Sequence, residues 1–156
     1  MNEFNVRIVR LEPLRVACVN GFGASPEGEA WSKLWSWAET KGLLKEYAGR
    51  RYFGYNNPNP TPGSPNYGYD QWMTVEPEIT SEGEIKVFDF PGGLYAVTRT
   101  GLDKIGENWM RLVAWVDDSQ YQVLHTTCLE ECLTPSAAMN GDMDGMILDL
   151  YLPVAE

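Results

Sequence analysis

The sequence predicts an α+β domain made of a duplicated strand–helix–strand–strand unit, with two copies around a pseudo-twofold axis. Three observations support this fold class. Two extended segments, residues 6–23 and 85–101, each break at a proline-containing turn and each precede a helical pattern. The helical patterns align at an offset of 78 residues, which places Trp31 against Trp109, and the closing strands align at an offset of 79. We therefore expect one domain over residues 1–156, with internal repeats at 5–76 and 84–155.

Each extended segment leads into an amphipathic helix. Ser25 is placed to cap the first helix, with Pro26 in its first turn and Gly42 as its stop, and Asp103 is placed to cap the second. Because large aromatic side chains dominate core burial, we expect the tryptophans of both helices to pack mainly in the core. The apolar stripes follow three- and four-residue spacing: Trp31, Leu34, Trp35 and Ala38 in the first helix, and Ile105, Trp109, Leu112, Val113 and Val116 in the second.

After each helix come a short strand, a connector and a closing strand. The connector at 56–66 carries four prolines, so we expect an irregular loop that serves either as a lid or as a link. Residues 136–146 are its counterpart in the second repeat. The elements together predict an antiparallel sheet with both main helices on one side. The strands are RYFGY (51–55) and DQWMTV (70–75) in the first repeat, and CLEECL (128–133) and DLYLPV (149–154) in the second.

The composition narrows the classes of partner. The net charge is −10, with a sequence pI near 4.5, so the chain repels phosphate backbones and we expect no direct contact with nucleic acid. The same field attracts cations, including organic ones. No apolar run reaches the roughly 20 residues that span a bilayer, and the N-terminus lacks the features of a signal peptide. We expect a cytoplasmic protein that does not associate with membranes.

Metal and cofactor chemistry finds little support in the sequence. The three cysteines are too few for a disulfide framework. His125, Cys128 and Cys132 have a zinc-like spacing, but a strand would turn them to different faces, and a structural zinc site needs four ligands. Asp142 and Asp144 lack the rest of a calcium loop. With no phosphate-binding glycine motif either, we expect no metal and no cofactor.

The stretch CLEECL puts two adjacent carboxylates in an apolar strand. Alternation sends Glu130 to one face and Glu131 to the other, so one glutamate faces the interior or a cavity. An unpaired buried carboxylate costs several kcal/mol, on the order of the penalty for one buried ion. Two interpretations remain open from the residues alone: a charge that serves a cleft, or an ion pair of Glu130 with one of Arg51, Arg111 and Lys86.

Four stretches in this order carry a family resemblance: YNNPNPTPGSPNYGYDQWMTV, GLDKIGENWMRLVAWVDDSQYQV, CLEECLTP and LDLYLPV. They resemble the GyrI-like small-molecule-binding domain, which is also the effector-binding module of many AraC-type and multidrug-responsive MerR-type regulators. They lie in this order between residues 55 and 154. The resemblance implies a ligand cleft where the two repeats meet, lined by aromatic side chains and holding one glutamate, in which family members bind flat, often cationic, aromatic compounds.

The resemblance also names residues. It aligns the glutamate of the family's acidic strand with Glu130, and with Glu131 if the alignment slips by one. The family's following tyrosine is Cys132 here, so the local pocket wall departs from the pattern. Trp72 and Tyr151 hold equivalent positions on the closing strands and are expected to face a common axis. Further candidates for the cleft are Trp109 and the tyrosines beside the proline loop, of which Tyr55 and Tyr69 are favoured over Tyr52 and Tyr67.

Three functions follow as hypotheses. The chain is about as long as the ligand domain itself, so we expect a stand-alone protein that captures planar, hydrophobic, often cationic aromatic compounds. The first alternative is a hydrolase of cyclopropane-bearing, DNA-alkylating natural products, with Glu130 as the catalytic carboxylate. The second is an interaction protein of the gyrase-inhibitor type, whose protein partner the sequence does not identify.

Overall fold

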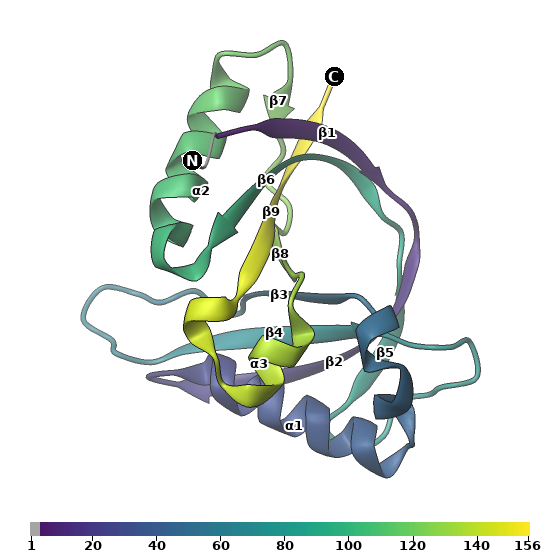
Figure 1. Ribbon diagram of the computed structural model, residues 1–156. Helices are drawn as coiled ribbons and strands as arrows, with labels where there is room; N and C mark the ends of the chain where they lie inside the picture. Colours follow the sequence, from purple (N-terminus) through teal and green to yellow (C-terminus); the bar gives the residue numbers. More distant parts are fainter. Residues whose placement is uncertain (1–3) are drawn as a thin grey trace.

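The computed structural model describes residues 4–156 as a strongly curled antiparallel sheet with helices on its outer side (Figure 1). The strands are β1 (Val6–Leu11), β2 (Leu14–Gly23), β3 (Tyr52–Asn56), β4 (Tyr67–Thr74), β5 (Lys86–Phe90), β6 (Gly93–Gly101), β7 (Gln122–Val123), β8 (Leu129–Cys132) and β9 (Ile147–Ala155). The α-helices are α1 (Pro26–Thr40), α2 (Ile105–Asp117) and α3 (Pro135–Asn140). Short 3-10 helices are η1 (Leu43–Gly49), η2 (Leu102–Lys104) and η3 (Met143–Gly145).

The strand order shows the duplication directly. Across the sheet it is β1-β6-β9-β8-β3-β4-β2-β5, so each half reads the same from its edge to the centre, and the predicted α+β fold is confirmed. The equivalent units are β2-α1-β3-β4 and β6-α2-β8-β9. The two edge strands are exchanged: β1 pairs with β6 of the second unit, and β5 pairs with β2 of the first. The pseudo-twofold axis therefore passes between the central strands β3 and β8.

Both main helices cover the same face of the sheet. Leu34 and Ala38 of α1 pack in a cluster with Ala17 and Met73, from β2 and β4. In the second unit, Leu112 and Val116 of α2 pack in the same way on β6 and β9. Cross-strand neighbours connect these two areas through β3 and β8, so they belong to one continuous face. The helix-covered face is therefore the outer side of the curled sheet.

The opposite face closes into a core of its own. Its cluster joins Val16 and Trp72 to Tyr95 and Tyr151, although β2 and β6 lie far apart in the strand order. Only a sheet that curls onto itself can bring such strands into one cluster. The inner face is therefore a packed, aromatic-rich interior.

The helix starts differ in detail from the sequence prediction. Ser25 occupies the N-cap position of α1 with Pro26 in the first turn, but its side chain makes no capping hydrogen bond. Asp103 does not cap α2: it lies within η2, and Lys104 is the N-cap residue, because the chain enters the helix through a tighter turn. Val113 is 38% exposed and lies outside the buried stripe. In the described part of the chain, no helix has the length and apolar character needed to cross a membrane.

Candidate functional site

A cavity of about 1070 Å³ lies on the helix-covered face, where the two repeats meet. Its walls come from α1, the β3–β4 connector, the start of α2 and the α3–η3 segment. The sheet contributes residues of β4, β8 and β9. A space of this size accommodates an organic ligand of several rings. The cavity lies between the repeats, the region in which the family resemblance implied a ligand cleft.

Glu130 lies in this cavity beside the pseudo-twofold axis. On β8 it is the direct cross-strand neighbour of Gly54 on β3. Its carboxylate accepts a hydrogen bond from Trp109 Nε1 at 3.0 Å and another from Tyr69 Oη at 3.0 Å. Both donors are neutral, and among residues 4–156 no ion pair involves Glu130. The site thus holds a negative charge that is oriented by the protein and not neutralised by it.

The surroundings shift the acidity of this carboxyl group. Burial raises the pKa of Glu130 above its usual value, and the nearby charge of Glu27 raises it further. The hydrogen bonds from Trp109 and Tyr69 act in the opposite direction because they favour the carboxylate. Desolvation is the largest of these effects, which is the expected result for a carboxylate facing apolar walls.

Gly54 makes the hydrogen bond from Tyr69 sterically feasible. A Cβ atom at this position would overlap the Tyr69 ring and hydroxyl group. The ring therefore lies directly over the Gly54 backbone and reaches across β3 to Glu130. Sequence reasoning missed this residue, although a glycine inside a strand pattern is a signal of close approach by another group.

Two tryptophans of α1 provide the aromatic wall. Trp31 and Trp35 line the cavity and stack with ring centroids 5.1 Å apart at an interplanar angle of 22°. The sequence prediction placed them in the core, but both remain partly exposed. The reason is geometric: Leu34 and Ala38 fill the contact with the sheet, and the adjacent stripe of the same helix turns toward the space between the repeats.

Three of the aromatic side chains predicted for the cleft require a correction. Trp72, Tyr151 and Tyr55 lie on the inner face of the sheet and do not line the cavity. Trp72 and Tyr151 are each 3% exposed. Side chains alternate between the two faces along a strand. Tyr69 and Gln71 are an odd number of residues from Trp72 on β4, so they point to the opposite face, where the cavity lies. Tyr69 and Trp109 are the predicted aromatic residues that contact Glu130.

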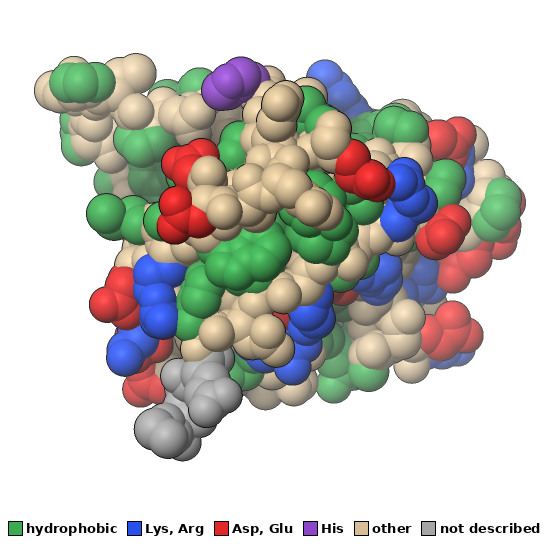
Figure 2. Space-filling model, turned by 90° about the horizontal axis from the view of Figure 1, so that it is seen from above, with side chains coloured by type: hydrophobic (Ala, Val, Ile, Leu, Met, Phe, Trp, Pro, Cys, Tyr) green, Lys and Arg blue, Asp and Glu red, His purple; other side chains and the backbone are tan. Residues whose placement is uncertain are grey.

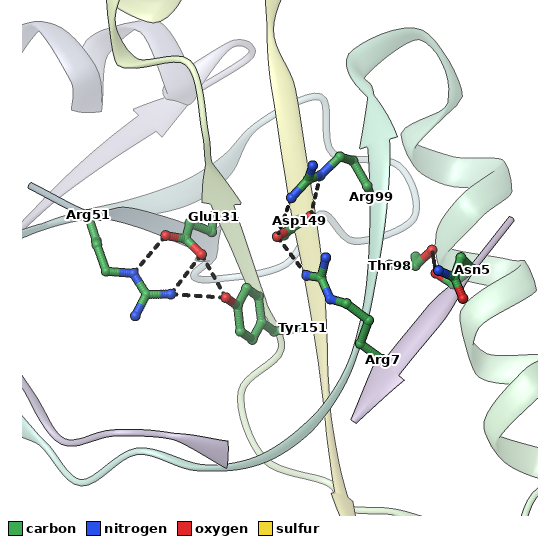
Figure 3. Close-up of polar contacts among 8 residues, drawn as sticks. All are labelled: Asn5, Arg7, Arg51, Thr98, Arg99, Glu131, Asp149 and Tyr151. Atoms are coloured by element: carbon green, nitrogen blue, oxygen red, sulfur yellow. Dashed lines mark hydrogen bonds and ion pairs between the residues drawn. The ribbon is translucent and has the colours of Figure 1, made fainter. Parts of the chain in front are cut away.

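Glu131 also lies on the inner face, where it has full charge compensation (Figure 3). Arg51 donates to both carboxylate oxygens, at 2.8 and 2.9 Å, and Tyr151 donates at 2.7 Å. The ion pair with Arg51 that the sequence left open for Glu130 is thus formed by its neighbour. A second group on the same face pairs Asp149 with Arg99 and Arg7.

The residues weighed as metal ligands are not brought together. The exposed histidine visible in Figure 2 is His125, the one histidine of the chain. Cys132, in contrast, is buried and lines the cavity on the helix-covered face. Within residues 4–156 no cluster of three or more His, Cys, Asp or Glu side chains has the geometry of a metal site.

The cavity is acidic. Glu27 and Glu39 of α1 line it together with Glu130, and its described walls contain no lysine or arginine. Glu27 accepts a hydrogen bond from Tyr67, and burial together with this bond raises the pKa of Tyr67 to about 12. The described walls of the cavity therefore combine carboxyl groups and aromatic rings with no basic side chain.

A family model matches almost the whole length of the chain and assigns its family. The model of the GyrI-like small molecule binding domain matches residues 4–155. This chain belongs to the GyrI-like family. A DNA gyrase inhibitor from Escherichia fergusonii is 35% identical over 108 residues, which cover 64% of this chain. The match spans 65% of that relative's own length.

Solved structures share the fold at low sequence identity. The EcmrR C-terminal domain superposes with a TM-score of 0.72 at 14% identity, covering 98% of both chains. A hydrolase from Listeria innocua reaches 0.69 at 10% identity, covering 96% of this chain and 91% of the other. SAV2435 bound to tetraphenylphosphonium reaches 0.51 at 10% identity, covering 99% and 94%. At these identities the likeness establishes the GyrI-like fold.

Proposed function

We propose that this GyrI-like protein binds planar, hydrophobic, cationic aromatic compounds in the cavity between its repeats, with Glu130 as the counter-charge. The observation that carries the proposal is the environment of Glu130. Its carboxylate faces a cavity of about 1070 Å³, accepts hydrogen bonds only from neutral donors among the described residues, and shares the cavity with the stacked rings of Trp31 and Trp35.

The carboxylate and the aromatic rings contribute separately to the expected binding energy. A delocalised cation near Glu130 gains attraction that a neutral compound of the same shape does not gain. A partly desolvated contact of this kind contributes about 1.5–3 kcal/mol. Ring faces add stacking and cation–π energy of about 0.5–2 kcal/mol per contact. Because Tyr69 and Trp109 hold the carboxylate in place beforehand, little side-chain ordering is needed on binding.

Family membership supports the coarser part of the proposal, the binding of a small molecule. The tetraphenylphosphonium bound to SAV2435, a protein of the same fold, is a tetrahedral aromatic cation, and it supports the cationic and aromatic character of the ligand but not its planarity. Glu130 is the candidate ligand-binding carboxylate, with Trp109 and Tyr69 as its hydrogen-bonding partners.

The test compares two probes of one shape. N-methylacridinium carries a positive charge, and 9-methylanthracene is its neutral isostere. We expect saturable binding of the cation with one site per chain in a fluorescence titration, and at least roughly tenfold weaker binding of the neutral compound, since tenfold corresponds to about 1.4 kcal/mol. Equal affinity for the two probes would reject the counter-charge role, and no binding of either would reject the cavity as an aromatic-cation site.

Hydrolysis is the second candidate function. Its supporting observation is the raised pKa of Glu130 in a cavity, which suits a general base acting on water. The Listeria innocua hydrolase of the same fold adds support. A cyclopropane-bearing alkylating compound supplied in tenfold excess distinguishes the two functions. An enzyme converts the excess, as followed by mass spectrometry, whereas a binding protein protects one equivalent and leaves the remainder.

Inhibition of DNA gyrase is the third candidate function. Its support is the sequence similarity to the DNA gyrase inhibitor of Escherichia fergusonii. A DNA supercoiling assay with purified gyrase tests it directly. Inhibition that persists when the cavity is saturated with N-methylacridinium would assign the activity to the protein surface and not to the cavity.

A further inference from the structure

The cavity is flanked by two connectors that hold equivalent places in the two repeats. Residues 57–66 join β3 to β4, and residues 133–146 join β8 to β9. Both contribute to the cavity walls. Their compositions differ: the first connector contains four prolines, and the second contains Met139, Met143 and Met146. We name residues 133–146 the methionine segment.

The methionine segment bridges the two helices. Its helix α3 packs against α1 and η1, and its 3-10 helix η3 packs against η2 at the start of α2. In Figure 1 it lies between α1 and α2 on the outer side of the sheet. All three methionines line the cavity, in which Trp31 and Trp35 form the stacked wall. The segment therefore closes the side of the cavity that the sheet and α1 leave open.

The methionine segment is held to the core by Ala137 and Ala138 of α3 and by Met146, and Met139 and Met143 do not belong to this contact. Neither α3 nor η3 contains a buried residue. Met139 is 37% exposed and Met143 is 56% exposed, whereas Met146, next to β9, is 7% exposed. The internal bonds are local, since the Asp142 side chain accepts from the backbone N–H of Gly145. The side chains of Met139 and Met143 can therefore change rotamer without disturbing the sheet that holds Glu130.

Methionine is suited to a wall of this kind. Its side chain is unbranched, has three rotatable bonds and carries a polarisable sulfur that contacts aromatic rings favourably. The proline connector has the opposite property, because each proline ring fixes a backbone angle. One flank of the cavity is therefore stiff and the other can repack.

We propose that Met139 and Met143, supported by Met146, form an adaptable wall that lets the cavity accept fused-ring aromatic cations of different sizes. This inference rests on the proposed function of the same cavity. It names the ligand class more closely: flat cations of two or more fused rings that lie between the Trp31–Trp35 stack and the methionine side chains. Glu130 selects ligands by their charge, and the methionine segment sets the range of ligand sizes that the cavity accepts.

The first test measures size tolerance. The probes are N-methylquinolinium, N-methylacridinium and ethidium, in order of size. The double variant Met139→Ile/Met143→Ile keeps an apolar wall of similar volume but stiffens it, because a β-branched side chain has fewer rotamers. We expect this variant to bind N-methylquinolinium as the wild type does and to bind ethidium roughly tenfold more weakly, the size of a modest overpacking cost. Met110→Ile is the matched control, because Met110 is 75% exposed on α2 and does not line the cavity.

The outcomes separate the two proposals. If the wild type binds none of the three cations, the proposed function fails. If the wild type binds them and the double variant changes all affinities equally, or none, the adaptable wall is rejected while the proposed function stands. A size-dependent loss in Met110→Ile as well would also reject the wall, because the effect would not then be local.

The second test asks whether the methionines contact the ligand. Hydrogen peroxide converts exposed methionine to the sulfoxide, and mass spectrometry reports each position. Saturating ethidium should slow the oxidation of Met139 and Met143 several-fold and leave that of Met110 unchanged in the same sample. Unchanged oxidation of Met139 and Met143 under saturation would overturn the inference.

Discussion

Two adjacent residues of one strand, Glu130 and Glu131, have the same chemistry and opposite surroundings. Glu131 faces the inner core, where Arg51 and Tyr151 satisfy its charge. Glu130 faces the cavity, where Tyr69 and Trp109 orient its charge without cancelling it. The comparison teaches that burial alone does not identify a functional carboxylate. What distinguishes the two is that the protein supplies a cation to Glu131 and, among the described residues, none to Glu130.

The largest effect is expected on the structural side of this comparison. Arg51→Ala leaves the buried Glu131 without its cation, and the loss of one partner of a fully buried pair costs about 3–5 kcal/mol. Arg51 is 41% exposed and solvent screens part of the charge, so we expect a loss of about 2–4 kcal/mol in the free energy of unfolding by urea. Arg99→Ala is the control: Asp149 keeps Arg7, and the loss should stay below about 1 kcal/mol. Equal losses of stability in the two variants would show that the ion pair of Arg51 with Glu131 stabilises the fold no more than the contact of Arg99 with Asp149.

The second largest effect is expected on ligand affinity when Glu130 is replaced. Glu130→Gln keeps the size of the side chain and removes its charge, so the affinity for N-methylacridinium should fall roughly ten- to a hundredfold, equivalent to about 1.5–3 kcal/mol. The affinity for 9-methylanthracene should change little, because stacking does not need the carboxylate. Glu131→Gln should leave both affinities nearly unchanged while lowering stability. If only Glu131→Gln lost affinity for the cation, Glu131 and not Glu130 would be the carboxylate that contacts the ligand.

Gly54→Ala tests the support of Glu130 from the opposite strand. The added methyl group meets the Tyr69 ring, so the ring must move away from Glu130 or the backbone must shift. We expect a cost of about 1–3 kcal/mol in stability, typical of an overpacked site, together with weaker binding of N-methylacridinium. Tyr69→Phe removes the hydroxyl group without overpacking and should weaken binding of the cation with a smaller loss of stability. Wild-type stability of Gly54→Ala would show that the ring has room to move.

The smallest effect is a pH dependence contributed by Glu130. Its pKa is raised in the folded protein above the reference value of 4.5, chiefly by burial. The folded state therefore holds this proton more tightly than the unfolded state, and the free energy of unfolding from this group falls as pH rises from about 4.5 through the raised pKa. Binding of N-methylacridinium needs the carboxylate, so it weakens as pH falls through the same range. Parallel titrations of Glu130→Gln supply the background from the other carboxyl groups, and both slopes should appear in the difference between the wild type and this variant.

The sequence predicted the fold better than the side chains that line the site. The offsets of 78 and 79 residues between repeats identified the equivalent helices and strands, because a duplicated unit repeats its pattern of burial. The same strand pattern assigned Trp72 and Tyr151 to one shared face but did not say which face carries the cavity. Both faces of this sheet are covered, by helices on one side and by its own curl on the other.

The aromatic wall was missed for a related reason. A helical stripe shows that Trp31 and Trp35 point away from solvent, and a core and a cavity wall both satisfy that condition. What decides between them is the distance between α1 and the α3–η3 segment, which depends on packing between distant parts of the chain. Gly54, by contrast, carried a local signal that sequence reasoning can use in related chains.

The exchange of the edge strands governs how the chain folds. Val6 of β1 pairs with Thr98 of β6, across 92 residues of sequence, and β5 likewise completes the sheet of the other repeat. A single repeat expressed alone would present an unpaired edge and an open aromatic interior, a combination that promotes aggregation. We therefore expect that neither repeat folds on its own. Because pairing between distant strands slows folding, we expect the cavity between the repeats to be completed only late, when the whole chain has closed.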